Sequence, residues 1–291
     1  MIGFIGAGNV GTTLGMYFHK MNMSISGYTS RTYISAKKSA SKTNSKTFEN
    51  IENLIISSKY VMITTPDDAI EDVVADIIMT NINLNNKVIC HTSGAHPSSV
   101  LEPLYQKGAT IASLHPILSF ADIEHALSLL HHTPFTLEGK GNIINEFIQL
   151  LEDNKLKIYN IKTKQKTLYH ASACIVSNYL VTLMDTGVQM LNMIGFDSKT
   201  SLELIEPLVK GTLNNIFEKG PESALSGPIA RGDISTIQKH IEVLSKQNKD
   251  INNIYSVLGN KTLDIVMRKN TLDENTVNNL REILKNEKNN D

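Results

Sequence analysis

The sequence predicts an α/β domain with a parallel sheet, followed by an all-α domain. In the first half of the chain, short runs rich in β-branched residues alternate with helical patterns, as expected for βαβ units. In the second half the hydrophobic period is helical throughout. The 291 residues suit two domains, each large enough to bury a core of its own. We therefore expect one domain at residues 1–162 and a second at residues 163–291.

The strands expected in the first domain follow one another at regular intervals. Five apolar runs predict the parallel sheet, at residues 2–5, 24–29, 60–65, 87–92 and 110–114. Two further strand-like runs, at residues 134–137 and 157–161, flank an amphipathic helical segment at residues 142–151. We expect these two runs to extend the sheet at one edge.

The second domain is expected to consist of helices. Helical patterns cover residues 166–194, 199–219, 233–246, 250–268 and 275–286. Gly195 is expected to end one helix and Asp197 to cap the next. The Gly-Pro pairs at residues 220–221 and 227–228 predict loops. The polar residues 287–291 are expected to be frayed.

A glycine motif lies between the first expected strand and a helical pattern at residues 12–21. It has the spacing GxGxxG, in which the glycines allow a tight turn, a close approach of the backbone to a pyrophosphate, and close packing of helix on strand. The N-terminus of the helix can direct its N–H groups at phosphates. A glycine-rich turn without a ligand is the alternative, but the flanking strand and helix favour a Rossmann-type dinucleotide-binding domain. The expected cofactor residues are Gly6, Gly8, Asn9, Val10 and Gly11.

The end of the second expected strand indicates which dinucleotide is bound. An NAD enzyme usually has an Asp or Glu there, whereas this chain has Ser30, Arg31 and Thr32. Arg31 can pair with a 2′-phosphate, and the two hydroxyl groups can donate to it. The sequence therefore predicts NADP, unless Arg31 is only a solvated surface cation. Thr65 and Pro66, at the end of the third of these expected strands, are further candidate cofactor contacts.

The composition argues against several classes of partner. The formal net charge is −1, and the 28 Lys and Arg residues are scattered, so nucleic-acid binding is not expected. Cys90 and Cys174 are the only cysteines and lack CxxC spacing, which argues against disulfides, a zinc site or a redox pair. A secretion signal and a run of about 18 apolar residues are also lacking. We expect a cytoplasmic protein with a small-molecule partner and no metal.

Two polar clusters follow expected strands, where open parallel sheets bind their ligands. Ser93 lies beside Gly94 after one strand, and His115 follows the next. A hydroxyl group there can contact a substrate carboxylate or carbonyl, and a histidine can hold or relay a proton. Alternatively, Ser93 caps the following helix and His115 is a satisfied, partly buried histidine.

A third cluster lies on the first expected helix of the second domain. At about 100° per residue, a row of side chains falls within an arc of about 60°; its members are Lys166, His170, Ala173 and Ser177. Lys166 suits a proton donor to a carbonyl oxygen that gains negative charge during hydride attack. Alternatively, Lys166 lies in a solvated first turn and His170 packs between the domains. Asn178, next to this row, is a candidate for positioning the substrate.

The glycine-rich segment 226–233 is expected to be a loop. Asp233 is a suitable N-cap for the helix that follows. In a dimer, Arg231 or Asp233 could instead border the site of the same subunit or of its neighbour.

Five segments together resemble a known family: GFIGAGNVG, HTSGAHPSSVL, SLHPILSF, KTLYHASACIVSNY and SGPIARGD. The family combines a Rossmann-like half with a domain of unknown function numbered 2520. It is similar to pyrroline-5-carboxylate reductases, ketopantoate reductases and the wider 6-phosphogluconate dehydrogenase superfamily. The resemblance implies that Lys166 matches the lysine found early on the first interdomain helix. It also implies a homodimer formed through the helical domain.

The substrate is implied less directly. Some members of this type have been associated with an alternative ketopantoate reductase, which reduces 2-dehydropantoate for pantothenate synthesis. The ordinary ketopantoate reductase pattern places an asparagine four residues after its lysine, whereas this chain has His170. The substrate-binding residues of ketopantoate reductases are therefore not assigned to positions in this chain.

The resulting hypothesis is hydride transfer from NADPH to a small 2-oxo acid, with 2-dehydropantoate as the first candidate. Lys166 would donate the proton, His170 or His115 would assist, and Ser93 and Asn178 would position the carboxylate. Two other readings stay open at this point. One is an imine reductase of the pyrroline-5-carboxylate type, and the other is an NADP-binding regulatory protein without turnover.

Overall fold

The computed structural model describes residues 1–285 of the chain. Two compact units are present, Met1–Asn178 and a second that begins at Tyr179. Each unit has a hydrophobic core of its own.

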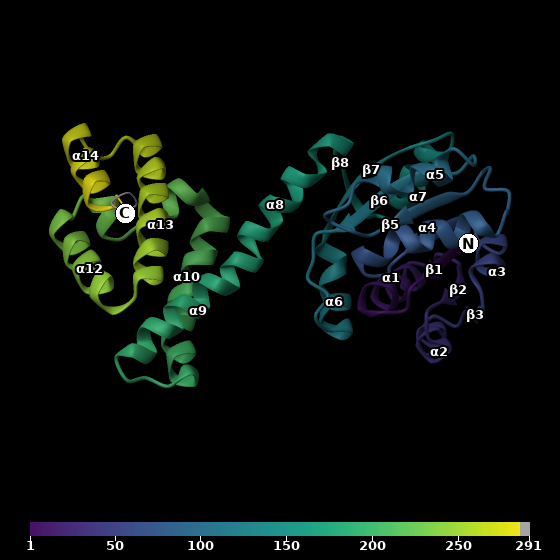
Figure 1. Cartoon of the computed structure of the whole chain (residues 1–291), viewed down its shortest axis with the longest axis horizontal. Coiled ribbons are helices and arrows are strands. Elements are labelled where there is room, and N and C mark those ends of the chain that lie inside the picture. Colours follow the sequence, from purple (N-terminus) through teal and green to yellow (C-terminus); the bar gives the residue numbers. More distant parts are fainter. Residues whose placement is uncertain (286–291) are drawn as a thin grey trace. The chain divides into compact units, whose positions relative to one another are not determined.

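The first unit is built on a single eight-stranded sheet (Figure 1). The strand order is β3-β2-β1-β4-β5-β6-β7-β8, and every neighbouring pair is parallel except β6 and β7. All seven expected strands form, and the two extra runs do extend the sheet at one edge, as β7 and β8. The strands are β1 (Ile2–Ile5), β2 (Ile25–Thr29), β3 (Lys46–Thr47), β4 (Tyr60–Ile63), β5 (Val88–His91), β6 (Thr110–Pro116), β7 (Pro134–Lys140) and β8 (Lys157–Asn160). The α/β class with a largely parallel sheet is thereby confirmed.

Two features of the sheet differ from expectation. The short edge strand β3 was not expected, because two polar residues carry no hydrophobic pattern; it forms by pairing with Gly27 and Tyr28. The strand β6 is longer than expected, because its antiparallel pairing with β7 continues to Pro116. His115 therefore lies within β6 instead of following it, and pairs with Thr136.

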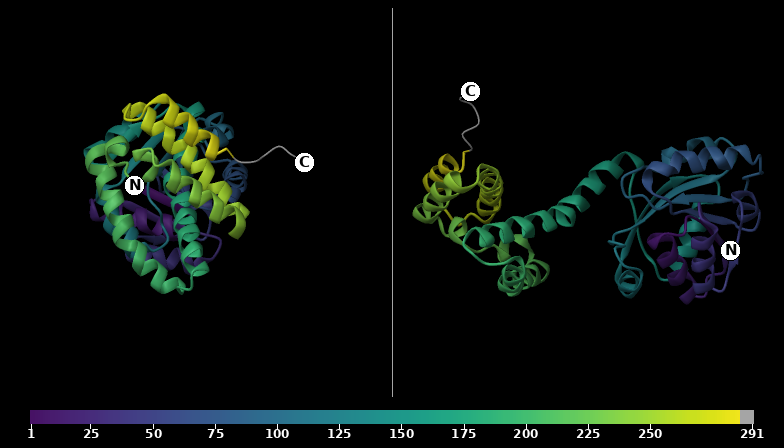
Figure 2. Two further views of the ribbon diagram at one scale, coloured as in Figure 1. Left: turned by 90° about the vertical axis from the view of Figure 1, so that its left-hand side faces the viewer. Right: turned by 60° about the horizontal axis from the view of Figure 1, so that its bottom comes forward.

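Helices cover both faces of the sheet (Figures 1 and 2). Phe4 and Ile5, neighbours on β1, point to opposite faces and belong to two separate core clusters. The Phe4 cluster includes side chains of α1, α2, α6 and α7, whereas the Ile5 cluster includes those of α3, α4 and α5. These helices are α1 (Asn9–Lys20), α2 (Tyr33–Lys42), α3 (Ile51–Ile56), α4 (Ile70–Met79), α5 (Glu102–Tyr105), α6 (Ile123–Leu129) and α7 (Ile144–Asp153).

The helical segment expected at residues 166–194 is two helices, α8 (Lys166–Val176) and α9 (Asn178–Met193). Ser177 separates them, with φ −116° and ψ −69°. The periodicity did not reveal this break because no Gly or Pro marks it. The helix α8 belongs to the first unit, and Lys166 at its start is fully buried.

The second unit is helical, as expected. It contains α10 (Ser198–Ala224), α11 (Pro228–Arg231), α12 (Ile234–Gln247), α13 (Lys249–Lys269) and α14 (Glu274–Ile283) in addition to α9. Its core is centred on Ile237, Leu263, Leu280 and Leu284. The two expected N-caps form: Asp197 accepts from Thr200 N at 2.9 Å and Asp233 accepts from Thr236 N at 3.1 Å.

Two loop predictions in the second unit need correction. The pair at residues 220–221 produces a kink within α10, because Gly220 has φ 77° while the residues on both sides of it are helical. The segment 226–233 is not purely a loop, because Pro228 starts the one-turn helix α11, which ends at Gly232 in the left-handed region. The expected end of the last helix at residue 286 and the fraying of residues 287–291 lie outside the described residues.

Within residues 1–285, no helix combines the length and the apolar character that a membrane span requires. In the same part of the chain, His, Cys, Asp and Glu side chains do not gather in groups of three or more that could hold a metal ion.

Candidate active site

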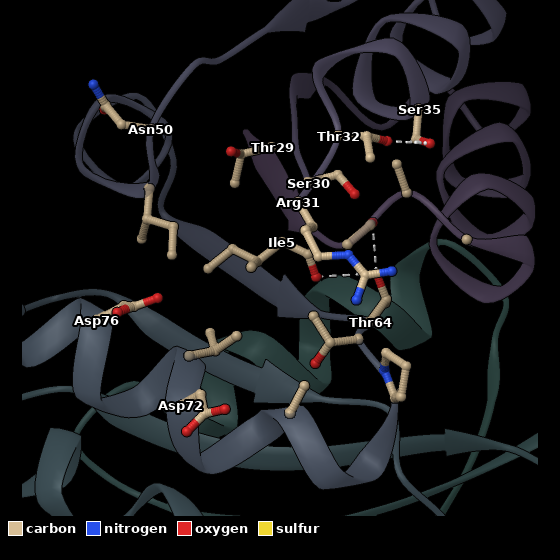
Figure 3. A pocket seen from close by; sticks show the side chains of 18 of the residues that line it. Ile5, Thr29, Ser30, Arg31, Thr32, Ser35, Asn50, Thr64, Asp72 and Asp76 are labelled. Atoms are coloured by element: carbon tan, nitrogen blue, oxygen red, sulfur yellow. Dashed lines mark hydrogen bonds between the residues drawn. The ribbon is translucent and has the colours of Figure 1, made fainter.

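A cavity of about 780 Å³ opens at the carboxyl ends of β1, β2 and β4. Here the strand order reverses, since β1 lies between β2 and β4, and open α/β sheets bind ligands at such a switch point. Seven of the ten expected cofactor residues line the cavity: Gly6, Gly8, Ser30, Arg31, Thr32, Thr65 and Pro66. Figure 3 shows three of them, Ser30, Arg31 and Thr32, in the cavity wall. Asn9, Val10 and Gly11 lie outside this lining.

The three glycines of the motif have different surroundings. Gly6 has φ +106°, and a Cβ atom on it would lie 2.7 Å from the backbone of Thr64. A Cβ on Gly11 would lie 2.4 Å from Thr64 Oγ1. Both glycines are therefore required for the loop to pack on the end of β4. A Cβ on Gly8 would meet no atom within 4 Å, so this glycine borders open space that a ligand can occupy.

The helix α1 begins directly after Gly8. Its N-cap offers no side-chain hydrogen bond, and the first helical bond runs from Thr12 N to Gly8 O at 3.0 Å. The preceding N–H groups and the positive end of the helix dipole can therefore hold phosphates. The side chain of Asn9 points elsewhere: it donates to the carbonyls of Phe120 and Ala121 at 2.9 and 3.2 Å, which ties α1 to the segment before α6.

Charged side chains line the cavity from two directions. Arg31 is exposed and follows β2, next to Thr32, whose hydroxyl donates to Ser35 at 2.7 Å. Asp72 and Asp76, one turn apart on α4, line another part of the wall (Figure 3). Arg31 can therefore pair with an anionic group placed at its end of the cavity.

Thr65 adds an unsatisfied polar atom to the wall. Its buried Oγ1 has no hydrogen-bond partner among residues 1–285. Buried hydroxyl groups nearly always have a partner, so Thr65 fits a contact with a bound molecule. Together with the open space at Gly8, this shows that the residues present suit a dinucleotide.

A chain of hydrogen bonds leads from this wall to the expected catalytic residues. Asp67 follows Pro66, and its Oδ2 accepts from Ser93 Oγ at 2.8 Å. Ser113 Oγ donates to the carbonyl of Ser93 at 3.3 Å and accepts from Lys166 Nζ at 2.7 Å. Ser93 Oγ also accepts from the N–H groups of Ala95 and His96 at 3.1 and 3.0 Å. The Ser93 hydroxyl is thus fully used in holding the Gly94 loop. It does not cap the following helix, whose N-cap is Pro97 without a side-chain hydrogen bond.

Lys166 is the most deeply buried cation of this cluster. The residue is 0% exposed, and its ammonium lies 5.6 Å from the centre of the Tyr169 ring. Burial lowers the pKa of Lys166 to about 8, while Glu138, followed by Cys90 and Asp67, opposes the shift. A lysine with such a pKa is mostly protonated at neutral pH and gives up its proton readily.

His115 and His170 converge on Gly94. A Cβ on Gly94 would lie 2.7 Å from both His115 Nε2 and His170 Nδ1, so the space beside this glycine is bordered by two imidazole nitrogens. His115 Nδ1 is 2.7 Å from the Tyr169 hydroxyl. Burial, together with the charges of Lys166 and His170, lowers the pKa of His115 to about 4, so its ring is neutral at pH 7. His170 Nδ1 is buried and has no partner among the described residues.

The structure therefore brings Lys166, His170, His115 and Ser93 together in one unit. Asn178 is exposed at the start of α9, outside this hydrogen-bond chain. Arg231 and Asp233 belong to the second unit, where Asp233 caps α12.

Sequence reasoning missed four members of the cluster: Asp67, Ser113, Glu138 and Tyr169. Asp67 directly follows Thr65 and Pro66, and Tyr169 precedes His170. Both are therefore chain neighbours of residues that the sequence does predict for the site. Ser113 and Glu138 gave no signal, because each lies inside a buried strand. Only the pairing of β6 with β7 brings them side by side.

Two models of known domains match the chain. Residues 1–116 match the model of a Rossmann-like domain, and residues 133–262 match that of a domain of unknown function, DUF2520. No curated protein matches the chain.

Solved structures match nearly the whole chain. A protein from Thermotoga maritima is 25% identical with a TM-score of 0.74, and the match covers 93% of this chain and 100% of the other. A putative NADP oxidoreductase from Bacteroides fragilis is 20% identical with a TM-score of 0.69, covering 89% and 96%. A pyrroline carboxylate reductase from Plasmodium falciparum, solved with NADP bound, is 16% identical with a TM-score of 0.58, covering 98% and 99%. These likenesses confirm the fold, and with the two domain matches they show that the chain combines a Rossmann-like domain with a DUF2520 domain.

Proposed function

We propose that this protein is an NADPH-dependent reductase of a small 2-oxo acid, with 2-dehydropantoate as the first candidate. The observation that carries the proposal is Lys166, a buried lysine joined by Ser113, Ser93 and Asp67 to the wall of a cavity that suits a dinucleotide. Two solved proteins of this fold support the choice of cofactor: the one from Bacteroides fragilis is described as a putative NADP oxidoreductase, and the pyrroline carboxylate reductase from Plasmodium falciparum has NADP bound.

The residues of the chain would have separate roles in binding the cofactor and in donating the proton. The N-terminus of α1 and the Gly8 gap would hold the pyrophosphate, and Arg31 with Ser30 and Thr32 would hold the 2′-phosphate. When bound, NADPH supplies the hydride that attacks the carbonyl carbon. Lys166 Nζ would donate a proton to the carbonyl oxygen as negative charge develops there.

The imidazoles of His115 and His170 would contact the substrate beside Gly94. Their ring nitrogens border the same small space, and a neutral His115 can donate one hydrogen bond from Nε2 while Nδ1 accepts from Tyr169. The hydroxyl of Ser93 would act by shaping the Gly94 loop. Asn178 stays a proposed contact to the substrate carboxylate.

A second candidate is reduction of a cyclic imine. The pyrroline carboxylate reductase from Plasmodium falciparum shares the fold, and an imine that arrives protonated needs no strong acid. A regulatory protein that binds NADP without turnover is the third candidate. The buried lysine counts against it, because a sensor does not need a proton donor at this depth.

One experiment separates the three candidates. The purified protein is mixed with NADPH and a panel of 2-oxo acids and cyclic imines, and loss of NADPH is followed by its absorbance. We expect turnover with a branched 2-oxo acid such as 2-dehydropantoate. Turnover with imines alone supports the second candidate, and tight NADPH binding without any turnover supports the third.

Arg31 is expected to determine the preference for NADPH over NADH. Because a charge-assisted hydrogen bond to a phosphate is lost, Arg31→Ala should weaken NADPH binding by about 10- to 100-fold and leave NADH binding unchanged. Lys38→Ala is the matched control, because Lys38 is also an exposed cation but lies on α2, outside the cavity lining. Titration calorimetry with both cofactors measures the effect, and an equal loss for NADPH and NADH would contradict the assignment.

We propose a homodimer formed through the helical unit. Large apolar side chains of α9 and α10 are exposed, among them Val181 (70%), Leu208 (72%) and Phe217 (84%). An exposed apolar surface on these helices would suit an interface, and a second copy carries the same surface. Sedimentation equilibrium is expected to give twice the chain mass, and a monomer at micromolar concentration would contradict the proposal.

A further inference from the structure

We infer that Glu138, a buried carboxylate on β7, is a positioning residue that keeps Lys166 positively charged and holds the start of α8 against the sheet. The inference rests on the proposed function, in which Lys166 acts as the proton donor. Nothing in the mechanism described above uses Glu138.

The sheet places Glu138 beside the lysine. Glu138 on β7 is the register partner of Ser113 on β6, and register partners in an antiparallel pair present their side chains on the same face. Ser113 Oγ is the group to which Lys166 Nζ donates. Glu138 therefore lies opposite the residue that anchors the ammonium, on the same face of the strand pair.

The contacts of Glu138 hold two segments together. Its Oε1 accepts from the backbone N–H of Ser98, and its Oε2 accepts from the hydroxyls of Ser98 and Thr163, both at 2.7 Å. Three donors on two oxygens suit an ionised carboxylate, which only accepts. Ser98 begins the turn after β5, and Thr163 begins the short 3-10 helix that leads directly into Lys166.

Burying an ionised carboxylate costs free energy unless hydrogen bonds or an opposite charge compensate it. Glu138 is 3% exposed, and an ion in a dry interior requires compensating partners. Lys166 is the buried cation nearby, and its ammonium donates to Ser113 instead of to a carboxylate. This arrangement stabilises the charge of the lysine while leaving its protons free for transfer to a substrate.

Several other groups face Lys166 from the surrounding elements. Besides Glu138, the thiol of Cys90 on β5 and the carboxylate of Asp67 favour the charged lysine. His91 and His115 do not oppose it, because burial lowers the pKa of both rings to about 4 and leaves them neutral where Lys166 titrates. Glu138 is the strongest of the favourable groups. Its removal should therefore leave a lysine that loses its proton at a lower pH.

The test compares the charge of Glu138 with its hydrogen bonds. Glu138→Gln removes the charge at constant size, whereas Ser98→Ala/Thr163→Val removes two hydrogen bonds and keeps the charge. The protonation of Lys166 is followed by NMR of protein with ¹³C-labelled lysine, and the resonance is assigned by its absence in Lys166→Met. This readout does not require turnover.

Glu138→Gln is expected to lower the pKa of Lys166 by about one unit or more, and to move the alkaline limb of the kcat profile by the same amount. The Ser98→Ala/Thr163→Val variant should lose thermal stability with little change in the pKa. An unchanged Lys166 pKa in folded Glu138→Gln protein would overturn the inference. A shifted pKa in a protein that reduces none of the tested compounds would support the inference and contradict the proposed function.

A stability cycle covers the case in which Glu138→Gln folds poorly. Unfolding is measured for the unchanged protein, Glu138→Gln, Lys166→Met and the double variant. A buried lysine without its counter-charge is destabilising, so Glu138→Gln should cost less in the Lys166→Met background than in the unchanged protein. Additive effects of the two substitutions would show that the two charges do not interact and would overturn the inference.

Discussion

Lys166→Met is expected to lower kcat for the reduction by about 10²- to 10⁴-fold, which is the usual contribution of a positioned general acid. Methionine has a length similar to lysine and suits a fully buried position, so the loss would come from the proton and not from a cavity. The dissociation constant of NADPH should stay the same, because Lys166 does not line the dinucleotide cavity. Stopped-flow measurement of NADPH oxidation, together with a binding titration, tests both expectations.

Lys164→Met is the matched control for this variant. Lys164 lies in the turn directly before α8 and is exposed, so its replacement removes a nearby positive charge without entering the cluster. Its kcat is expected to stay within about twofold of the unchanged protein, as is usual for exposed positions away from special contacts. Near-normal turnover by Lys166→Met would exclude Lys166 as the acid and would make the Tyr169 hydroxyl the next candidate.

If Lys166 is the proton donor, it also predicts the pH dependence of the proposed reduction. Because burial lowers the pKa of Lys166 to about 8, the donor is charged at pH 6 to 7 and loses its proton as the pH rises through that value. The kcat should therefore fall with a midpoint near pH 8. His115 adds no acidic limb above about pH 4, since its own pKa is lowered to about 4.

Gly8→Val is expected to weaken NADPH binding by about 100-fold or more without lowering the melting temperature. A side chain here would occupy the space into which the pyrophosphate must come, and a loss of about 3 kcal/mol corresponds to a factor of this size. A Cβ on Gly8 would meet no protein atom within 4 Å, so the fold has room for it. Calorimetric titration and thermal unfolding measure the two effects separately.

Gly11→Val gives the contrasting result. Its Cβ would lie 2.4 Å from Thr64 Oγ1 and 2.5 Å from Gly6 O, where the loop packs on the end of β4. This variant should lose stability, by about 1 to 3 kcal/mol as expected for overpacking. If Gly8→Val binds NADPH with unchanged affinity, the phosphates do not lie at this loop and the cofactor assignment fails.

Much of the fold was predictable from local patterns. The seven strand-like runs became β1, β2 and β4 to β8, because they are rich in β-branched or aromatic residues. The boundaries failed where tertiary pairing decided them. Pairing with β7 carried β6 on to Pro116, and pairing with β2 created β3 from the polar residues Lys46 and Thr47.

The candidate site was predictable only where local sequence patterns mark its residues. Residues at strand ends and in the glycine motif carry short-range signals, and seven of those ten expected cofactor residues line one cavity. Asn9 has the right position in the motif, but its side chain is taken by the carbonyls of Phe120 and Ala121, more than a hundred residues away. No local pattern encodes a contact of that kind.

The sequence by itself determined that a glycine turn joins a strand to a helix, that Arg31 replaces the usual acidic residue, and that a lysine begins α8. These properties depend on the identity of a residue and on its neighbours in the chain. Only the tertiary structure decided that Lys166 is buried, that Ser113 anchors it, and that Glu138 supplies the counter-charge. Burial and charge pairing depend on which strands lie side by side, and that arrangement joins residues that the chain itself keeps far apart.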